Sequence, residues 1–294
     1  MRILGIILAG TVVTAITGCI TNSYSETMAA GYVPTEPRSC STRLSDSNQA
    51  HLHELNSSEI RLVNWNIQKG GDPDWTSDLE SLMGEPDLMV FQEAAVESSD
   101  WETVGNTHYR SFAPGFRTLR SMTGVMTLSA AEPLAQCNLV SREPWLGSQK
   151  ATVITEYGLT ETDRTLLVVN IHAINFTFGT RDFETQIRRA LESISAHDGP
   201  ILLSGDFNTW HLGRMEKLQK MLAPRGFVAL EYDVDHRKRA FGQALDHIYV
   251  RGLHPIEATT SQVITSDHNP MSVRLRLDTD DRLTSAYSLG GGGN

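Results

Sequence analysis

Short apolar runs that alternate with helical segments constrain the fold of this chain most strongly. Three segments have apolar residues at helical spacing, namely Asp74–Met83, Asp182–Ala196 and His211–Leu222. Strands interleaved with helices predict sheets covered by helices in one α/β domain, residues 59–278. The runs, rich in Val, Ile, Leu and Phe as strands are, are Leu62–Trp65, Leu88–Phe91, Val125–Leu128, Ala151–Thr155, Thr165–Val169, Ile201–Leu203, His247–Val250 and Met271–Leu277.

The first residues of the chain have the composition of an export signal. Residues 1–18 combine a positive start with an apolar run that ends at Ile16 and is followed by small residues. The run is shorter than the roughly 20 residues of a membrane span. Ile16-Thr17-Gly18-Cys19 resembles a bacterial lipobox, in which Cys19 is lipidated after cleavage. We expect an exported membrane lipoprotein that faces the periplasm or the exterior; a plain signal peptide and a buried helix of a cytoplasmic protein are the alternatives.

Two further segments and two further cysteines lie outside this pattern. Residues 19–58 are rich in Ser, Thr, Asn, Pro and Glu and predict a linker or arm. Residues 279–294 end in four glycines and an asparagine and predict a flexible tail. Cys40 and Cys137 would form one disulfide in an oxidising compartment and tie the arm to the core. Two buried free thiols are the alternative, because spacing alone does not show proximity.

Polar side chains follow directly after several predicted strands. Strand ends are where open α/β sheets collect ligand sites, so we expect these side chains to converge. Converging buried carboxylates need a cation or hydrogen-bond donors. The residues concerned are Asn66, Gln68, Glu93, Asn170, His172, Asp206 and Asn208.

The types of ligand in these segments indicate a hard cation. Glu93, Asn66 and Gln68 offer oxygen donors and no cysteine is near them, which favours Mg²⁺ or Mn²⁺ over Zn²⁺. Such an ion binds phosphate oxygens and stabilises an in-line displacement. Asp206 and Asn208 project to the same side of an extended segment, where one can activate water and the other can donate a hydrogen bond to a phosphoryl group.

Seven motifs, taken in order, resemble the endonuclease/exonuclease/phosphatase (DNase I-like) superfamily. The resemblance implies a four-layer α/β/β/α sandwich of two mixed β-sheets flanked by helices, with the site at one edge of the sheets. Parts of the chain look closer still to the bacterial YafD-like group. The motifs are Asn-Trp-Asn66-Ile-Gln, Gln-Glu93, Gly124-Val-Met-Thr-Leu-Ser129, Asn170-Ile-His172, Gly-Asp206-Phe-Asn208, Leu-Asp246-His-Ile and Ser266-Asp267-His268-Asn-Pro270.

The resemblance also implies a role for each motif residue. Metal ligands would be Asn66 and Glu93, with Asp267 near the metal. Gln68 stands where some relatives carry an Asp ligand, so one and two metal ions both stay open. The implied catalytic set is Asp206 for orienting or deprotonating water, Asn208 and His172 for holding the phosphate, and His268, oriented by Asp246, for stabilising the pentacovalent phosphorus.

Two departures from the relatives limit what can be carried over to this chain. Abasic-site endonucleases have a tyrosine where this chain has Met122. Pancreatic deoxyribonuclease pairs a histidine with a glutamate in a region where Thr123 is the nearest residue here.

Five residues are candidates for binding the substrate. Asn170 precedes His172 in its motif, and Trp210 is either a stacking residue near Asn208 or part of the core. Arg142 lies in a segment that resembles a DNA-contacting one in pancreatic deoxyribonuclease, with a surface arginine as the alternative. Arg237 and Arg239 belong to a basic cluster that either grips a phosphate or offsets nearby aspartates.

The net charge of −10 makes the chain a poor general binder of polyanions. We expect a Mg²⁺-dependent phosphodiesterase that acts on nucleic acid, with its basic groups concentrated at the site. A lipid phosphodiesterase of sphingomyelinase type or a phosphatase at the membrane surface, tethered through Cys19, is the first alternative. A non-catalytic binding lipoprotein is the second. No obligate protein partner is inferred.

Overall fold

The computed structural model describes residues 36–45, 53–82, 84–104, 108–119 and 121–278, and all of them belong to one compact unit. The predicted signal segment, Cys19 and the glycine-rich tail lie outside these ranges. Within the described part of the chain, no helix is long and apolar enough to cross a membrane.

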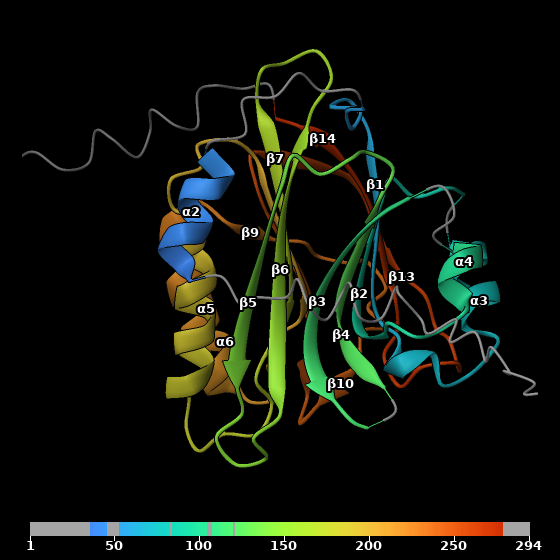
Figure 1. Ribbon diagram of the computed structural model, residues 1–294, viewed down its shortest axis with the longest axis vertical. Coiled ribbons are helices and arrows are strands. Elements are labelled where there is room, and N and C mark those ends of the chain that lie inside the picture. The colour runs from blue at the N-terminus through green and yellow to red at the C-terminus, as the bar shows by residue number, and fades with distance from the viewer. Residues whose placement is uncertain (1–35, 46–52, 83, 105–107, 120, 279–294) are drawn as a thin grey trace, which may run out of the picture. The chain divides into compact units, whose positions relative to one another are not determined.

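Two six-stranded sheets form the centre of the domain (Figure 1). The first has the order β13-β14-β1-β2-β4-β3 and the second β5-β6-β7-β8-β12-β9. Their bounds are β1 (Ile60–Asn66), β2 (Leu88–Ala95), β3 (Tyr109–Arg117), β4 (Met122–Ser129), β5 (Ala135–Arg142), β6 (Gln149–Gly158), β7 (Thr165–His172), β8 (Ile201–Asp206), β9 (Val228–Ala229), β12 (Asp246–Arg251), β13 (Leu253–Thr260) and β14 (Met271–Leu277). The short strands β10 (Arg239–Ala240) and β11 (Gln243–Ala244) form a separate hairpin.

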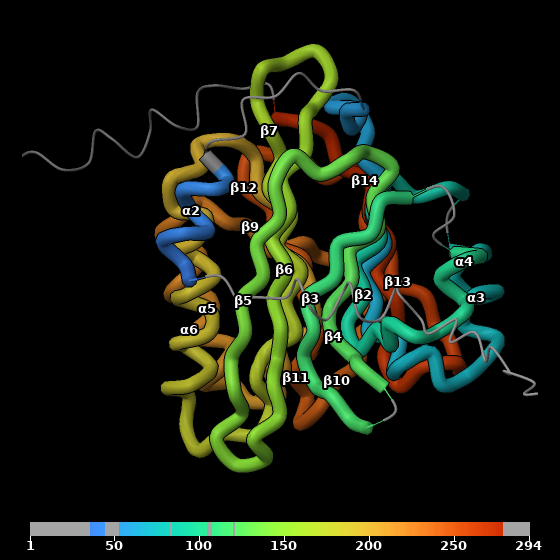
Figure 2. The backbone as a smooth tube through the Cα atoms, viewed as in Figure 1, coloured from blue at the N-terminus to red at the C-terminus, as the bar shows by residue number. Residues whose placement is uncertain are grey.

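Helices cover the outer face of each sheet. Figures 1 and 2 show α2 (Pro37–Ser45), α5 (Arg181–Ser193) and α6 (Leu212–Leu222) on the side of the second sheet. On the side of the first sheet lie α3 (Trp75–Leu82) and α4 (Asp100–Val104). Short 3₁₀ turns, η1 (Gln68–Gly70) and η2 (Ala223–Arg225), follow β1 and α6. The predicted four-layer α/β/β/α sandwich is confirmed.

Each sheet contains one parallel strand pair, and the two pairs set the location of the polar strand ends. β1 pairs with β2, and β7 pairs with β8, both in parallel. A parallel connection needs a crossover, which α3 and α5 supply. The carboxyl ends of the two strands in each pair therefore meet at one edge of their sheet.

Strand alternation decides which side chains face the other sheet. Leu62 and Leu202 belong to the apolar cluster between the sheets, whereas Trp65 packs under α3 and Leu203 under α5 and α6. Because alternate residues share a face, Asn66 and Asp206 point into the space between the sheets.

The predicted arm contains helix α2, which the composition of residues 19–58 did not indicate. Leu44 of α2 and Cys40 are buried in the cluster formed with α5 and the second sheet. Cys40 forms a disulfide with Cys137 of β5, which confirms the expectation of a disulfide over that of free thiols.

Replacing Cys137 with serine should lower the free energy of unfolding substantially. The two cysteines are 97 residues apart in sequence, and closing a loop of that length stabilises the folded state by about 4–5 kcal/mol in the chain-entropy model. Chemical denaturation of the oxidised protein and of the variant measures the difference, with Cys40→Ser as the matched control. Equal midpoints would contradict a stabilising disulfide.

Candidate active site

The polar ends of β1, β7, β8 and β12 meet between the two sheets. His172 and Asp206 are opposite one another in the parallel register of β7 and β8, and Asp246 is opposite Asp206 in the antiparallel register of β8 and β12. All three side chains are buried, as are Asn66 and His268. The structure therefore brings together residues that are up to 202 positions apart, from Asn66 to His268.

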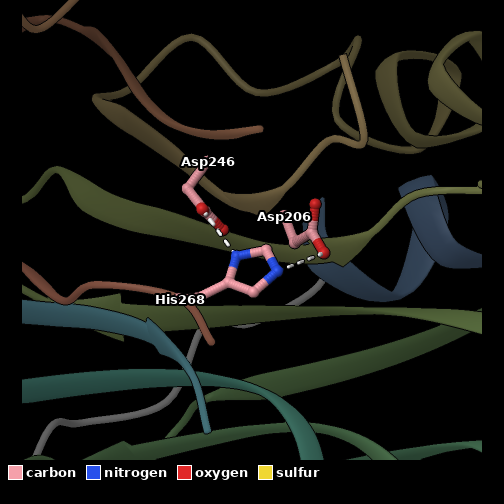
Figure 3. A group of neighbouring side chains, drawn as sticks. All are labelled: Asp206, Asp246 and His268. Atoms are coloured by element: carbon pink, nitrogen blue, oxygen red, sulfur yellow. Dashed lines mark hydrogen bonds and ion pairs between the residues drawn. The ribbon is translucent and has the colours of Figure 1, made fainter. Parts of the chain in front are cut away.

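The Asp206 carboxylate lies at the centre of this group. Its Oδ2 accepts a hydrogen bond from Asn66 Nδ2 at 3.1 Å and lies 3.6 Å from His172 Nε2. Its Oδ1 accepts from the backbone N–H of Asn208 at 2.9 Å. The gap of 3.9 Å between Oδ2 and His268 Nε2 is longer than a hydrogen bond (Figure 3). Asp206, at the end of β8, and His268, in the loop before β14 of the other sheet, thus face the same space.

His268 is oriented by a buried carboxylate on one side and by the backbone on the other. Its Nδ1 donates to Asp246 Oδ2 at 2.7 Å, which leaves Nε2 directed toward Asp206 (Figure 3). The His268 carbonyl accepts from the indole N–H of Trp65 at 2.8 Å. The Trp65 ring is fully buried in the cluster under α3, on the opposite face of β1 from Asn66.

Local charges favour a cationic His268, and burial makes the Asp206 carboxylate more basic. Burial alone would lower the pKa of His268, but the carboxylates of Asp246 and Asp206 outweigh it and raise this pKa well above the usual range. Burial raises the pKa of Asp206 above its ordinary value; the His268 cation opposes this shift and Asp246 adds to it. A buried carboxylate of raised pKa beside an imidazolium is suited to general-base work.

His172 pairs with Lys150, a residue that the sequence did not single out. Lys150 is the second residue of β6, and its Nζ lies 2.7 Å from His172 Nε2. Burial, followed by the Lys150 and His268 charges, holds the pKa of His172 well below its ordinary value. A neutral His172 accepts this hydrogen bond, so Lys150 supplies the positive charge on this side of the site. No local motif marks Lys150, since its role arises from a contact between neighbouring strands.

The backbone of the predicted metal ligands is strained. Within the described residues, six non-glycine residues have positive φ, and four of them are Gln68, Lys69, Glu93 and Asn208. Such conformations are costly outside glycine and tend to persist where function requires them. Glu93 adopts φ +52° where the ladder between β2 and β4 is interrupted. The interruption lies between Phe91 and Ala94 and includes Gln92, the partner of Asn66 in the β1–β2 register.

The oxygens of Glu93 and Asn66 suit a hard divalent cation. The Glu93 carboxylate is half-buried and makes a long ion pair of 3.9 Å with Lys69. Asn66 Oδ1 accepts from the backbone N–H of Gln68 at 3.1 Å and keeps a second lone pair. Carboxylate and amide oxygens are ligands of Mg²⁺ and Mn²⁺, so the donor set fits such an ion.

A second group could also hold a metal ion. One ligand atom each from Asp206, Asp246 and His268 lies within 4.8 Å of the others. Binding a cation among all three would compete with the 2.7 Å hydrogen bond between His268 and Asp246. The other two predicted ligands lie outside this group, since Gln68 is exposed and Asp267 is exposed beside Lys238 at 3.8 Å.

The loop that carries Asn208 is held by a buried arginine. Arg214 is fully buried in α6, and its Nη1 donates to the Asn208 and Ile174 carbonyls at 2.9 and 2.7 Å. Asn208 Nδ2 itself donates to the Ala173 carbonyl at 2.9 Å, so one of its two amide hydrogens is already engaged.

Gly205 allows the close approach of β8 to β7, because a Cβ there would lie 1.9 Å from the Ile171 carbonyl oxygen.

Asn170, expected among the substrate-binding residues, lies between the sheets instead. Its Nδ2 donates to the Phe91 and Met126 carbonyls at 3.1 and 3.0 Å, and its Oδ1 accepts from Gln92 at 2.9 Å. Gln92 also donates to Asn64 at 3.1 Å. Asn170 is fully buried and its polar atoms are occupied, so it joins the sheets directly beneath the site.

The basic cluster is largely engaged within the protein. Arg237 makes a bidentate pair with Asp235 at 2.8 and 2.9 Å and donates to the Asp246 carbonyl at 3.1 Å. Arg239 also pairs with Asp235, at 2.5 Å. These contacts favour the second of the two alternatives given above, that the arginines offset nearby aspartates, because both of them pair with Asp235. Arg237 instead supports the strand end that carries Asp246.

The remaining two substrate-binding candidates differ in exposure. Arg142 is exposed at the end of β5 and has no ion-pair partner among the described residues. Trp210 is half-buried, stacks over Arg214 at 5.0 Å and donates to the Asn175 carbonyl at 3.3 Å. Trp210 therefore lies at the boundary between the core and the surface of the domain.

Sequence and structure comparisons agree on the relatives of this chain. The model of the Endonuclease/Exonuclease/phosphatase family matches residues 63–268. A UPF0294 protein of Yersinia pseudotuberculosis is 38% identical over 219 residues, which cover 74% of this chain and 84% of the relative. One from Vibrio parahaemolyticus is 33% identical over 223 residues, covering 75% and 79%.

Two solved structures show the same fold at low sequence identity. An endonuclease/exonuclease/phosphatase from Beutenbergia cavernae has a TM-score of 0.61 at 15% identity, covering 75% of this chain and 72% of its own. The human Nocturnin catalytic domain, solved with bound sulfate, has a TM-score of 0.60 at 14% identity, covering 79% and 98%.

Proposed function

We propose a phosphodiesterase activity for this chain, which belongs to the endonuclease/exonuclease/phosphatase family and is a metal-dependent phosphoester hydrolase. The observation that carries the proposal is the convergence of the Asp206 carboxylate with the His268 cation and with the Lys150–His172 pair. His268 Nε2 lies 3.9 Å from Asp206 Oδ2. His172 Nε2 lies 3.6 Å from the same Asp206 oxygen and 2.7 Å from Lys150 Nζ.

Different residues of the site carry out different parts of the reaction. The Asp206 carboxylate orients a water molecule and takes its proton as the water oxygen attacks phosphorus and the ester P–O bond breaks. The His268 cation, held by Asp246, stabilises the negative charge that develops on the phosphoryl oxygens. Lys150 adds a second positive charge, and neutral His172 fixes its position.

A divalent cation would be held by Glu93 and Asn66. When bound, Mg²⁺ or Mn²⁺ supplies charge neutralisation at the phosphoryl oxygens. The half-buried Glu93 oxygens and the free lone pair of Asn66 Oδ1 support this assignment.

A single negative charge on the substrate suits this set of groups. A phosphate monoester carries up to two charges at neutral pH, and recognition of such a dianion commonly uses an arginine fork. Arg237 and Arg239 are paired with Asp235. A diester therefore matches the remaining charges better than a monoester.

Two substrate classes fit a phosphodiesterase, namely nucleic acid and phospholipid. Nucleic acid was the first expectation from the sequence, and Trp210 with Phe241 favours it. Their rings are 6.1 Å apart beside the Asn208 loop, and Phe241 is 87% exposed, as a base-stacking residue would be. The pairing of Arg237 and Arg239 with Asp235 weakens the case for nucleic acid, because phosphate contacts supply most of a protein's affinity for nucleic acid. The phospholipid class is supported by a separate surface, described below.

The proposal is tested with soluble esters that carry an activated p-nitrophenolate leaving group and need no membrane surface. Full-length protein, with Cys19→Ser to prevent lipidation, is assayed on bis(p-nitrophenyl) phosphate and p-nitrophenyl phosphate. We expect Mg²⁺- or Mn²⁺-dependent cleavage of the diester, loss of activity with a chelator and recovery when the metal is returned. Cleavage that persists in excess chelator, or of the monoester alone, would overturn the proposal.

A further inference from the structure

Half of the exposed large apolar side chains lie on three loops at the edge of the sheets that carries the site. Twelve such side chains are exposed among the described residues. Two lie at the β3–β4 turn, two at the β5–β6 turn and two in the β7–α5 loop. This apolar rim consists of Phe116, Leu119, Trp145, Leu146, Phe176 and Phe178, which are 47%, 105%, 59%, 65%, 55% and 77% exposed. A contiguous patch of this kind on a soluble domain commonly marks an interaction surface.

Contacts between the three loops make the rim continuous. The buried Glu143 carboxylate accepts hydrogen bonds from the backbone N–H groups of Asn175 and Phe176 at 2.7 and 3.3 Å, which ties the β5–β6 turn to the β7–α5 loop. The rings of Trp145 and Phe178 are 3.9 Å apart. At the other side, β3 packs closely on the start of β6, where a Cβ at Gly115 would lie 3.0 Å from the Gln149 carbonyl oxygen. Figure 1 shows β3 and β5 ending toward the same, lower side of the view.

The rim borders the proposed catalytic groups directly. Lys150 is the second residue after the β5–β6 turn. The β7–α5 loop begins after His172, the last residue of β7. A surface that meets the rim would therefore lie beside the Lys150–His172 pair.

Exposed arginines stand at the ends of the three loops. Arg117, Arg142 and Arg181 are exposed, and none of them forms an ion pair with another described residue. Glu143, the acidic side chain between two of the loops, is 2% exposed and is occupied by its backbone contacts. On a chain of net charge −10, these three unpaired arginines suit an anionic surface.

We propose that the apolar rim is a membrane-docking surface and that the substrate is a lipid-borne phosphodiester, an inference that rests on the proposed phosphodiesterase function. Aromatic and aliphatic side chains flanked by arginines are the composition of surfaces that lie in the headgroup region of anionic bilayers. Leu119 and Leu146 stand at the tips of their turns and have no ring with which to stack on a base, which favours a bilayer over single-stranded nucleic acid. The lipidation predicted at Cys19 carries no part of this inference.

The test separates docking from chemistry. The parent is full-length protein with Cys19→Ser, the rim variant adds Trp145→Ser and Leu146→Ser, and the control adds Val228→Ser. Val228 is 64% exposed but pairs with Val250, four residues from the site end of β12. Each protein is sedimented with phosphatidylcholine vesicles that contain phosphatidylglycerol. Its binding to a single-stranded oligonucleotide is measured separately in solution. Each is also assayed on bis(p-nitrophenyl) phosphate and on the vesicle lipid.

We expect the rim variant to bind the anionic vesicles roughly tenfold more weakly than the parent. Its hydrolysis of vesicle lipid should fall in proportion, while its cleavage of the soluble diester stays unchanged and the control behaves like the parent. Vesicle binding that is equal in parent and rim variant, or a loss of oligonucleotide binding in place of vesicle binding, would overturn the docking surface. A parent that cleaves no soluble diester would instead overturn the proposed function.

Discussion

Replacing His268 with glutamine should lower kcat for diester hydrolysis by about 10³-fold or more. The side chain is buried and its Nδ1 donates to Asp246 at 2.7 Å. A glutamine amide can keep a hydrogen bond to Asp246 but removes the positive charge. The loss should appear in kcat, because the charge acts on negative charge that develops only in the transition state.

Asp246→Asn is the matched control for the His268 variant. Asp246 acts through His268, so the double variant should lose little more activity than His268→Gln alone. Thermal unfolding of each variant separates the loss of charge from a loss of fold. A kcat within about tenfold of the parent in a folded His268→Gln protein would contradict the role of the imidazolium.

Replacing Lys150 with methionine should lower kcat/KM by about 10²–10³-fold, the range found when a positioned donor is removed from a water-excluded site. Methionine retains the unbranched side chain and loses the charge beside His172. The pKa of His172 should rise in this variant, because the Lys150 cation no longer opposes protonation, although burial still holds it low. Enzyme kinetics and titration of the histidine resonances by NMR measure the two effects.

Lys150→Arg is the conservative counterpart. It keeps the charge and should recover part of the activity, whereas a purely structural role for Lys150 would alter the unfolding temperature and leave the pKa of His172 unchanged. If Lys150→Met retained parental kcat/KM, the second cation would have no part in the reaction.

The central strands of the fold were predictable, and its edge strands were not. All eight predicted strands are present, and all of them are interior strands of their sheets. The longer strands that were missed, β3, β5 and β13, are all edges of their sheets. Edge strands tolerate proline and polar residues because one side needs no hydrogen-bonded partner. Pro114 in β3 and Pro255 in β13 are of this kind.

Site residues were predictable where they stand at strand ends and where the alternation of side chains along a strand sets their direction. Asn66, His172 and Asp206 end their strands. Asp246 and His268 were indicated by motif resemblance, and the structure joins them by a hydrogen bond. His247 follows Asp246 and so faces the opposite side of β12, where its Nε2 is hydrogen-bonded to the Thr209 hydroxyl at 2.7 Å.

Contacts between distant segments explain what sequence reasoning missed. Lys150 gains its role only through His172 on the next strand. Arg214 looks like an ordinary helical arginine, yet it is buried and holds the Asn208 loop. For Arg237 and Arg239 the sequence left a substrate phosphate and nearby aspartates as alternative partners, and the fold places Asp235 against both. Charge pairing of this kind depends on loop conformation, which local sequence does not specify.

Diffraction from crystals grown with Mn²⁺ and orthovanadate tests most directly whether one cation and one phosphorus meet between the sheets. The anomalous signal of Mn²⁺ should lie on the Glu93 carboxylate and the Asn66 amide oxygen. The vanadate should lie within hydrogen-bond distance of His268 Nε2 and Lys150 Nζ, with Asp206 facing its equatorial or apical oxygens. Mn²⁺ bound between Asp206 and Asp246 with His268 displaced, or vanadate outside this cleft, would contradict the assignment.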